Sequence, residues 1–184
     1  NIYKACSYSF EKGCGSYLFD GQKYEYQIET YQKQKILYEK AKNKENILEI
    51  GTYMGHSLLI ILMANPSVNI TCIDINDRYS LPSVKYLQKE FPESNINFIK
   101  SDSLKVLKGL KEKYDLIHID GTHNNKIVTK EFYYCMNLTK EKNAEFIFDD
   151  RENILILIKN IIETFFIKDS ISPKCIYSNL YLNI

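Results

Sequence analysis

Short apolar runs alternate with longer helix-like segments along most of the chain, and this alternation restricts the fold more than any other feature. The runs expected to form strands are Ile47–Ile50, Asn69–Ile75, Ile96–Lys100, Asp115–Ile119 and Glu145–Asp149. The segments expected to form helices are residues 24–41, Met54–Ala64, Ser80–Phe91, Ser103–Leu110, Lys126–Leu138 and Ile154–Phe165. Two further strands, Ile167–Ile171 and Cys175–Leu182, are expected around Pro173. Such alternation predicts a mostly parallel sheet with right-handed crossovers.

We therefore expect an α/β fold with a Rossmann-like, mostly parallel sheet, helices on both of its faces and an antiparallel last strand. The 184 residues amount to about one domain. Within it, residues 1–44 should form an N-terminal arm and helix, and residues 45–184 the sheet domain. Ligands of open parallel sheets bind at the carboxyl ends of the strands. The residues that follow each strand should therefore carry the function.

Charge and cysteine content exclude several classes of protein. The formal net charge is +1, so we expect no broad basic surface for nucleic acid or for an anionic membrane. The five cysteines are an odd number without regular spacing, which favours a reducing compartment over a disulfide framework. Cys6 and Cys14 flank a glycine-containing loop but lack a second Cys or His pair, so we expect no metal site there.

The start of the sequence and its most apolar run bear on where the protein acts. The first residues are polar and mixed, unlike a signal peptide. The run Ile154–Ile167 contains Lys159 and Glu163 and is too short to span a bilayer. We therefore expect a cytoplasmic protein with neither a membrane nor a nucleic-acid partner. Because the sequence begins with Asn1 rather than Met, we expect a trimmed chain or part of a longer polypeptide. Whether it forms a homo-oligomer is left open.

Acidic residues stand at the end of each of the five expected strands. They are Glu49, Asp74, Asp102, Asp120 and the pair Asp149-Asp150. Acids can simply cap the helices that follow, and this explanation suits Asp102. Five such positions in succession are difficult to attribute to capping alone. The pattern therefore predicts a ligand site along the carboxyl edge of the sheet.

A glycine-containing turn follows the first strand, with the sequence Gly51-Thr52-Tyr53-Met54-Gly55. Its glycines allow a tight strand-to-helix turn, and the helix N-terminal amides then face a ligand. Asp74 ends the next strand at about the spacing of a ribose-binding acid. Glu49 would oppose the pyrophosphate of a dinucleotide, and the middle glycine of a G-x-G turn is missing. S-adenosylmethionine (SAM) has no phosphate and carries two cations, so it suits Glu49 better.

Three motifs in this region resemble those of class I SAM-dependent methyltransferases. Ile47–Ser57 resembles their first motif, Ile73–Asn76 their ribose motif and Lys100–Ser103 their adenine-edge motif. The resemblance covers roughly residues 45–150 and implies that residues 45–184 form a methyltransferase domain. It implies the following cofactor-binding residues: Glu49, Gly51, Thr52, Tyr53, Gly55, Ser57, Asp74, Asp102 and Ser103. Of these, Asp74 would bind the ribose hydroxyls, and Asp102 with Ser103 would lie at the adenine.

Acids after the fourth and fifth strands predict a second, chemical part of the site. The two strand ends can be neighbours, so Asp120, Asp149 and Asp150 could form a carboxylate cluster. Like charges at close range raise one another's pKa, and a divalent cation relieves the repulsion. Oxygen ligands favour Mg²⁺, Mn²⁺ or Ca²⁺, and Mg²⁺ is our expectation. The alternative is that Asp149-Asp150 caps a helix beginning near Glu152, with Arg151 as salt partner.

The arrangement resembles the metal-dependent O-methyltransferases of the catechol and macrolide-sugar types. By that resemblance Asp120, Asp149 and Asp150 hold the metal, and His123 stands where the catechol type has Lys and the sugar type has a His base. The metal would acidify an acceptor hydroxyl, His123 would remove its proton, and the oxygen would attack the SAM methyl group. Asp120 and His123 are thus the expected catalytic residues.

Because His123 matches the sugar type, the expected acceptor is a sugar or another small diol. It could be a small molecule or a glycan. A phenol or catechol is the main alternative. Two other classes stay open: a nicotinamide-dependent oxidoreductase on a similar sheet, and a non-catalytic SAM-binding module.

Overall fold

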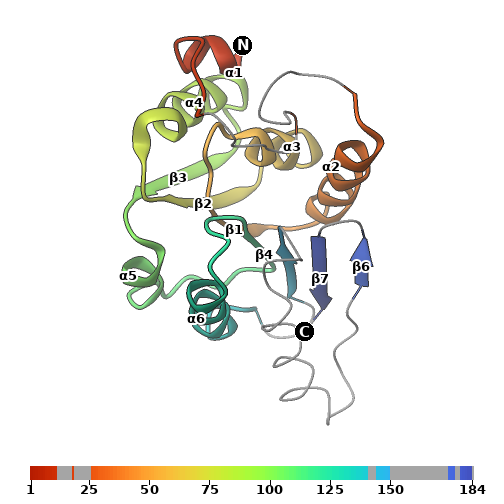
Figure 1. Ribbon diagram of the computed structural model, residues 1–184, viewed down its shortest axis with the longest axis vertical. Helices are drawn as coiled ribbons and strands as arrows, with labels where there is room; N and C mark the ends of the chain where they lie inside the picture. Colours follow the sequence, from red (N-terminus) through yellow and green to blue (C-terminus); the bar gives the residue numbers. More distant parts are fainter. Residues whose placement is uncertain (12–17, 19–25, 141–143, 150–173, 177–178, 184) are drawn as a thin grey trace.

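Five parallel strands form the centre of the computed structural model, which describes residues 1–11, 18, 26–140, 144–149, 174–176 and 179–183 (Figure 1). These strands are β1 (Asn46–Ile50), β2 (Asn69–Asp74), β3 (Asn95–Lys100), β4 (Leu116–Ile119) and β5 (Glu145–Phe148). Within the described residues they lie in the order β3-β2-β1-β4-β5. Each neighbouring pair is parallel. The mostly parallel α/β sheet is therefore confirmed.

Two short strands extend the sheet beyond β5. They are β6 (Lys174–Ile176) and β7 (Asn179–Asn183), and β7 lies between β5 and β6. β7 pairs antiparallel with both neighbours. The single strand expected at Cys175–Leu182 is thus wrong, because two strands occupy this stretch. The expected strand Ile167–Ile171, and the expected helix Ile154–Phe165, lie outside the described residues.

Helices cover both faces of the sheet (Figure 1). One face carries α1 (Ile2–Ala5), α2 (Ile28–Ala41), α3 (His56–Ala64) and α4 (Asp77–Glu90), whose apolar side chains share one buried core with the sheet. The other carries α5 (Ser103–Leu107) and α6 (Asn125–Met136), with a second core. In β1, Ile47 belongs to the first core and Leu48 to the second, as the alternation of strand side chains requires.

Side-chain caps set the starts of α4 and α6, and two other helices also begin away from the sequence-based boundaries. Asn76 accepts a hydrogen bond from the Arg78 N–H, so α4 begins at Asp77 and not at Ser80. Asn124 accepts from the N–H groups of Lys126 and Ile127 at the start of α6. Helix α3 begins after Gly55 rather than at Met54, and α2 at Ile28 rather than residue 24.

The N-terminal arm packs on the sheet domain rather than apart from it. Helix α1, which the sequence did not predict, contacts α4, and α2 contacts α3. The Cys6 thiol is buried and lies 3.2 Å from Ser83 Oγ of α4. Among the described helices, none combines the length and apolar character that a membrane span requires.

Candidate functional site

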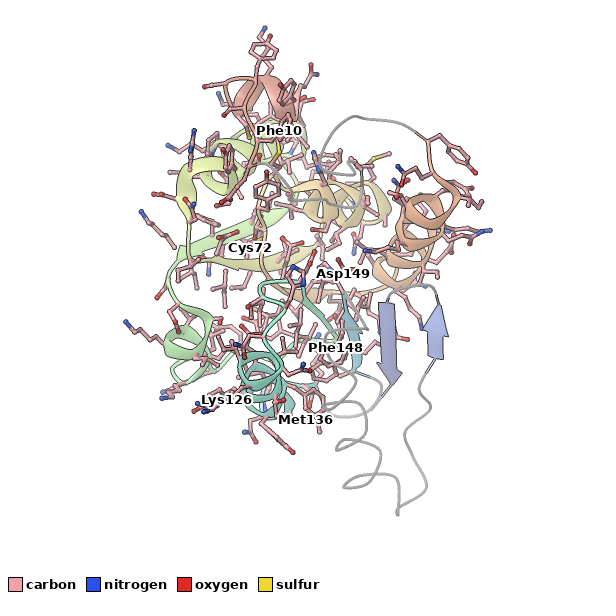
Figure 2. All side chains as sticks on the ribbon, viewed as in Figure 1. Phe10, Cys72, Lys126, Met136, Phe148 and Asp149 are labelled. Atoms are coloured by element: carbon pink, nitrogen blue, oxygen red, sulfur yellow. The ribbon has the colours of Figure 1, made fainter. Side chains whose placement is uncertain are left out.

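A cavity of about 810 Å³ lies at the carboxyl ends of the parallel strands. Residues after all five strands line it, as the parallel topology requires. The sequence-predicted residues among its lining are Gly51, Thr52, Tyr53, Ser57, Asp74, Asp102, Ser103, Asp120, His123 and Asp149. Figure 2 labels Phe148 at the end of β5 and Asp149 just beyond it. One cavity thus collects seven of the nine predicted cofactor residues and the described part of the predicted chemical site.

The turn after β1 is held by a close approach to the end of β4. Gly51 has a φ of +88°, and a Cβ placed on it would lie 2.2 Å from the backbone oxygen of Asp120. Tyr53 also has a positive φ, 43°, and Gly55 has a φ of 70° at the start of α3. Only glycine fits at Gly51, because both the space and the dihedral angle exclude a side chain.

Asp74, at the end of β2, fixes this turn through backbone hydrogen bonds. Its Oδ2 accepts from the N–H groups of Thr52 (3.0 Å) and Tyr53 (2.7 Å). Its Oδ1 accepts from the Asn76 N–H over 2.9 Å. Burial raises the pKa of the Asp74 carboxyl, whereas these N–H donors act to lower it. Since a carboxylate has about four acceptor positions, capacity remains for a ligand hydroxyl.

Glu49 and Gly55 do not line the cavity, although both were predicted to bind the cofactor. The Glu49 side chain is fully buried, and its Oε1 accepts a 2.6 Å hydrogen bond from Ser57 Oγ. His118 is also fully buried, with Nδ1 3.6 Å from the same Glu49 oxygen. Because side chains alternate along β1, Glu49 shares the face of Ile47 and points under α3. Glu49 therefore contacts a residue of the cavity wall, Ser57, without lining the cavity itself.

The edge at β3 contains a residue that the sequence analysis missed. Asp102 caps α5 by accepting a hydrogen bond from the Lys105 N–H, which is the capping role given above as the alternative to ligand binding. Ser103 donates instead to Oε1 of Glu131, a buried residue of α6 that also lines the cavity. Burial raises the pKa of Glu131, and the Ser103 hydrogen bond opposes the rise. A signal was present: Glu131 falls among the apolar positions Val128, Phe132 and Cys135 on the buried face of α6.

The opposite end of the cavity contains Asp120, His123 and Asp149. Asp149 forms an ion pair with Lys33, which reaches the cavity from α2. No signal in the sequence links this lysine, more than a hundred residues away, to β5. Glu11 lines the cavity too, and its N–H donates to the Tyr53 hydroxyl over 2.8 Å. The N-terminal arm therefore contributes to the site.

The described residues do not by themselves fit a divalent cation. Asp150, the third predicted ligand, lies outside them. Within the described part of the chain, no three His, Cys, Asp or Glu side chains are grouped to hold a metal. Asp149 already has a cationic partner in Lys33.

His56, at the start of α3, is buried and lines the same cavity. Burial lowers its pKa to about 4, so the imidazole is neutral near pH 7. At the first position of α3, His56 forms part of the cavity wall.

Two curated relatives match about half of this chain. Tapetum-specific methyltransferase 1 of Arabidopsis thaliana is 32% identical over 93 residues, covering 48% of this chain and 40% of that protein. A polyamine aminopropyltransferase of Clostridium botulinum is 30% identical over 98 residues, covering 50% of this chain and 34% of that protein. The chain thus spans two fifths or less of the length of these two curated relatives.

A solved structure shows the same fold. The O-methyltransferase TomG from Streptomyces achromogenes, crystallised in complex with SAM, superposes with a TM-score of 0.66 at 15% identity. The superposition covers 83% of this chain and 79% of TomG. A methyltransferase domain family matches residues 48–151, a stretch that includes every strand-end residue discussed above. Since this match covers more than half of the 184 residues, the chain belongs to that family of methyltransferase domains.

Proposed function

We propose that the chain is a SAM-dependent O-methyltransferase that methylates a hydroxyl group of a sugar or another small diol. The observation that carries this proposal is the single cavity at the strand ends, which joins the Gly51–Gly55 turn and Asp74 to His123. Its volume of about 810 Å³ falls within the usual range for ligand sites. The membership in a methyltransferase domain family supports the choice of cofactor.

The reaction needs a base and an orienting pocket. We propose that the imidazole of His123, an exposed residue at the cavity wall, takes the proton of the acceptor hydroxyl. The acceptor oxygen then forms a bond to the methyl carbon as the bond from that carbon to the sulfonium sulfur breaks. The products are the methyl ether, S-adenosylhomocysteine (SAH) and a proton on His123. The protein contributes mainly alignment of oxygen, carbon and sulfur.

The divalent cation expected from Asp120, Asp149 and Asp150 stays a prediction. Its test is turnover in excess chelator, with and without later addition of Mg²⁺. Abolished and restored turnover would support the metal, whereas full activity in chelator would make the acids structural. Lys33→Met tests the competing cation at Asp149, because removing the ammonium should strengthen Mg²⁺ binding if Asp149 is a ligand.

Other functions lead to different outcomes in the same assay. One relative is named an aminopropyltransferase, so the matched stretch does not by itself choose the transferred group. A phenol or catechol acceptor would leave the methyltransferase proposal standing and change only the substrate. A nicotinamide-dependent enzyme would bind NAD in preference to SAM, and a non-catalytic module would bind SAM without turnover. A cytoplasmic location, and the absence of nucleic-acid and membrane partners, remain predictions.

The experiment is a screen of diol sugars, catechols and other hydroxylated acceptors with methyl-labelled SAM under identical conditions. We expect label transfer to at least one diol sugar. Transfer to catechols alone would make the sugar assignment wrong, and transfer to none with retained SAM binding would favour the binding module.

A further inference from the structure

Glu131 carries a buried oxygen for which the described residues supply no hydrogen-bond partner. The side chain is 1% exposed and lines the cavity from α6. Ser103 Oγ donates to its Oε1, whereas Oε2 has no donor among the described residues. A buried acceptor left without a donor is costly, so such atoms in native proteins usually serve a ligand or a water.

The topology places Glu131 at the adenine end of the proposed cofactor. Asp74, at the end of β2, is the predicted ribose-binding acid, and β3 is the next strand outward. The base should therefore lie over the end of β3, where Ser101, Asp102 and Ser103 line the cavity. Glu131 is hydrogen-bonded to Ser103, so its carboxyl group lies at this end and not among Asp120, His123 and Asp149.

We propose that Glu131 Oε2 accepts a hydrogen bond from the exocyclic amino group of adenine and so selects adenine over other nucleobases. The inference rests on the proposed function, because it takes the nucleoside to be that of SAM. Ser103 holds the carboxyl group in place through Oε1, and Oε2 is the oxygen that the described residues leave without a donor. Asp102 does not take this role, since its carboxylate caps α5.

The chemistry of the two groups explains the selectivity. Adenine presents an N–H donor at position 6, whereas hypoxanthine presents a carbonyl oxygen there. A carboxylate oxygen has no proton to offer that carbonyl, so the two acceptors face each other unpaired. Sites built to bond one polar group reject analogues that cannot form the bond. We expect the intact site to bind SAH at least about tenfold more tightly than S-inosylhomocysteine.

Glu131→Gln should weaken or reverse the preference for adenine over hypoxanthine while keeping the shape of the side chain. The amide oxygen can still accept from Ser103, and the amide NH₂ then replaces Oε2. That NH₂ group cannot accept a hydrogen bond from the amino group of adenine, but it can donate one to the carbonyl oxygen of hypoxanthine. The preference for SAH should fall to threefold or less, or invert. Glu131→Met has similar length and no polar atom, so it should fold and lose the preference without inverting it.

The measurement is calorimetric titration of the full chain with SAH and with S-inosylhomocysteine. The variants are Glu131→Gln, Glu131→Met, Asp102→Asn and the exposed control Glu93→Gln, which should retain the wild-type ratio. An unchanged ratio in both Glu131 variants, or its loss in Asp102→Asn alone, would overturn the proposal. Equal binding of both nucleosides by the wild type would overturn only the role of Glu131. Binding of neither by folded protein would overturn the cofactor as well.

Discussion

The two ends of the cavity are built in different ways. At the cofactor end, formed by the carboxyl ends of β1, β2 and β3, Asp74 accepts three backbone N–H groups and Gly51 lies against the backbone of Asp120. At the proposed acceptor end, formed after β4 and β5, His123 is exposed, and Asp149 pairs with a lysine from α2.

This difference separates what the fold dictates from what the individual protein adds. Backbone contacts at the cofactor end leave little freedom for change, which suits a ligand shared by many transferases. Side chains at the acceptor end can change without disturbing the sheet, which suits a substrate that differs from one protein to another. Mutations at the two ends should therefore have different consequences.

Gly51→Ala should have the largest effect, because it forces a Cβ into the backbone of Asp120 at the cofactor end. We expect a loss of more than about 4 kcal/mol in the free energy of unfolding, measured by urea denaturation. The matched control is Gly109→Ala, whose Cβ would lie 3.7 Å from the nearest backbone oxygen. It should change stability by less than about 1 kcal/mol. Equally small losses of stability in Gly51→Ala and Gly109→Ala would contradict a rigid backbone at the cofactor end.

His123→Ala tests the acceptor end. If His123 is the base, methyl transfer at neutral pH should fall by about 10²–10⁴-fold. SAH affinity and stability should change little, because the side chain is exposed. Single-turnover rates with saturating SAM measure methyl transfer, and calorimetry measures SAH affinity. A rate loss below about threefold would show that His123 is not the base.

His56 offers a contrast with His123, since it is the same residue type buried at the cofactor end. Its pKa is lowered to about 4, whereas an unfolded histidine titrates near 6.5. The unfolded chain therefore binds the extra proton first, and stability is lost as the pH falls from about 6.5 to 4. The loss attributable to His56 should approach about 3 kcal/mol at the acid end of that window.

The measurement is urea unfolding of wild type and His56→Gln across this pH range. Buried acids such as Asp74 and Glu131 titrate in both proteins, so the difference isolates His56. Parallel pH profiles for the two proteins would show that His56 does not titrate as proposed.

Asp74→Asn should have the smallest of these effects, seen as a loss of SAH affinity together with some loss of stability, because an NH₂ donor replaces an oxygen that accepts backbone N–H groups. The amide removes the charge from an acceptor of three N–H groups and of the proposed ribose hydroxyl. We expect SAH affinity to fall by about tenfold to a hundredfold, measured by calorimetry. Asp77→Asn, an acid on the surface in α4 paired with Lys100, should leave the affinity unchanged. A similar loss in both variants would point to a general effect of charge.

The sequence predicted the elements that depend on local pattern and missed the contacts that depend on distant packing. The five strand ends meet in one cavity because parallel topology allows no other outcome, and this could be foreseen from their order. The Lys33–Asp149 ion pair could not, because nothing in either segment indicates that α2 passes over β5. Glu131 lay between these cases, since an acid on an apolar helix face was visible but its partner Ser103 was not.

Titration of the wild-type chain with SAH tests the central claim most directly. The account predicts saturable one-to-one binding in the micromolar range, with NAD giving no heat under the same conditions. Folded wild-type protein that gives no heat with SAH or SAM, or that binds NAD instead, would contradict it.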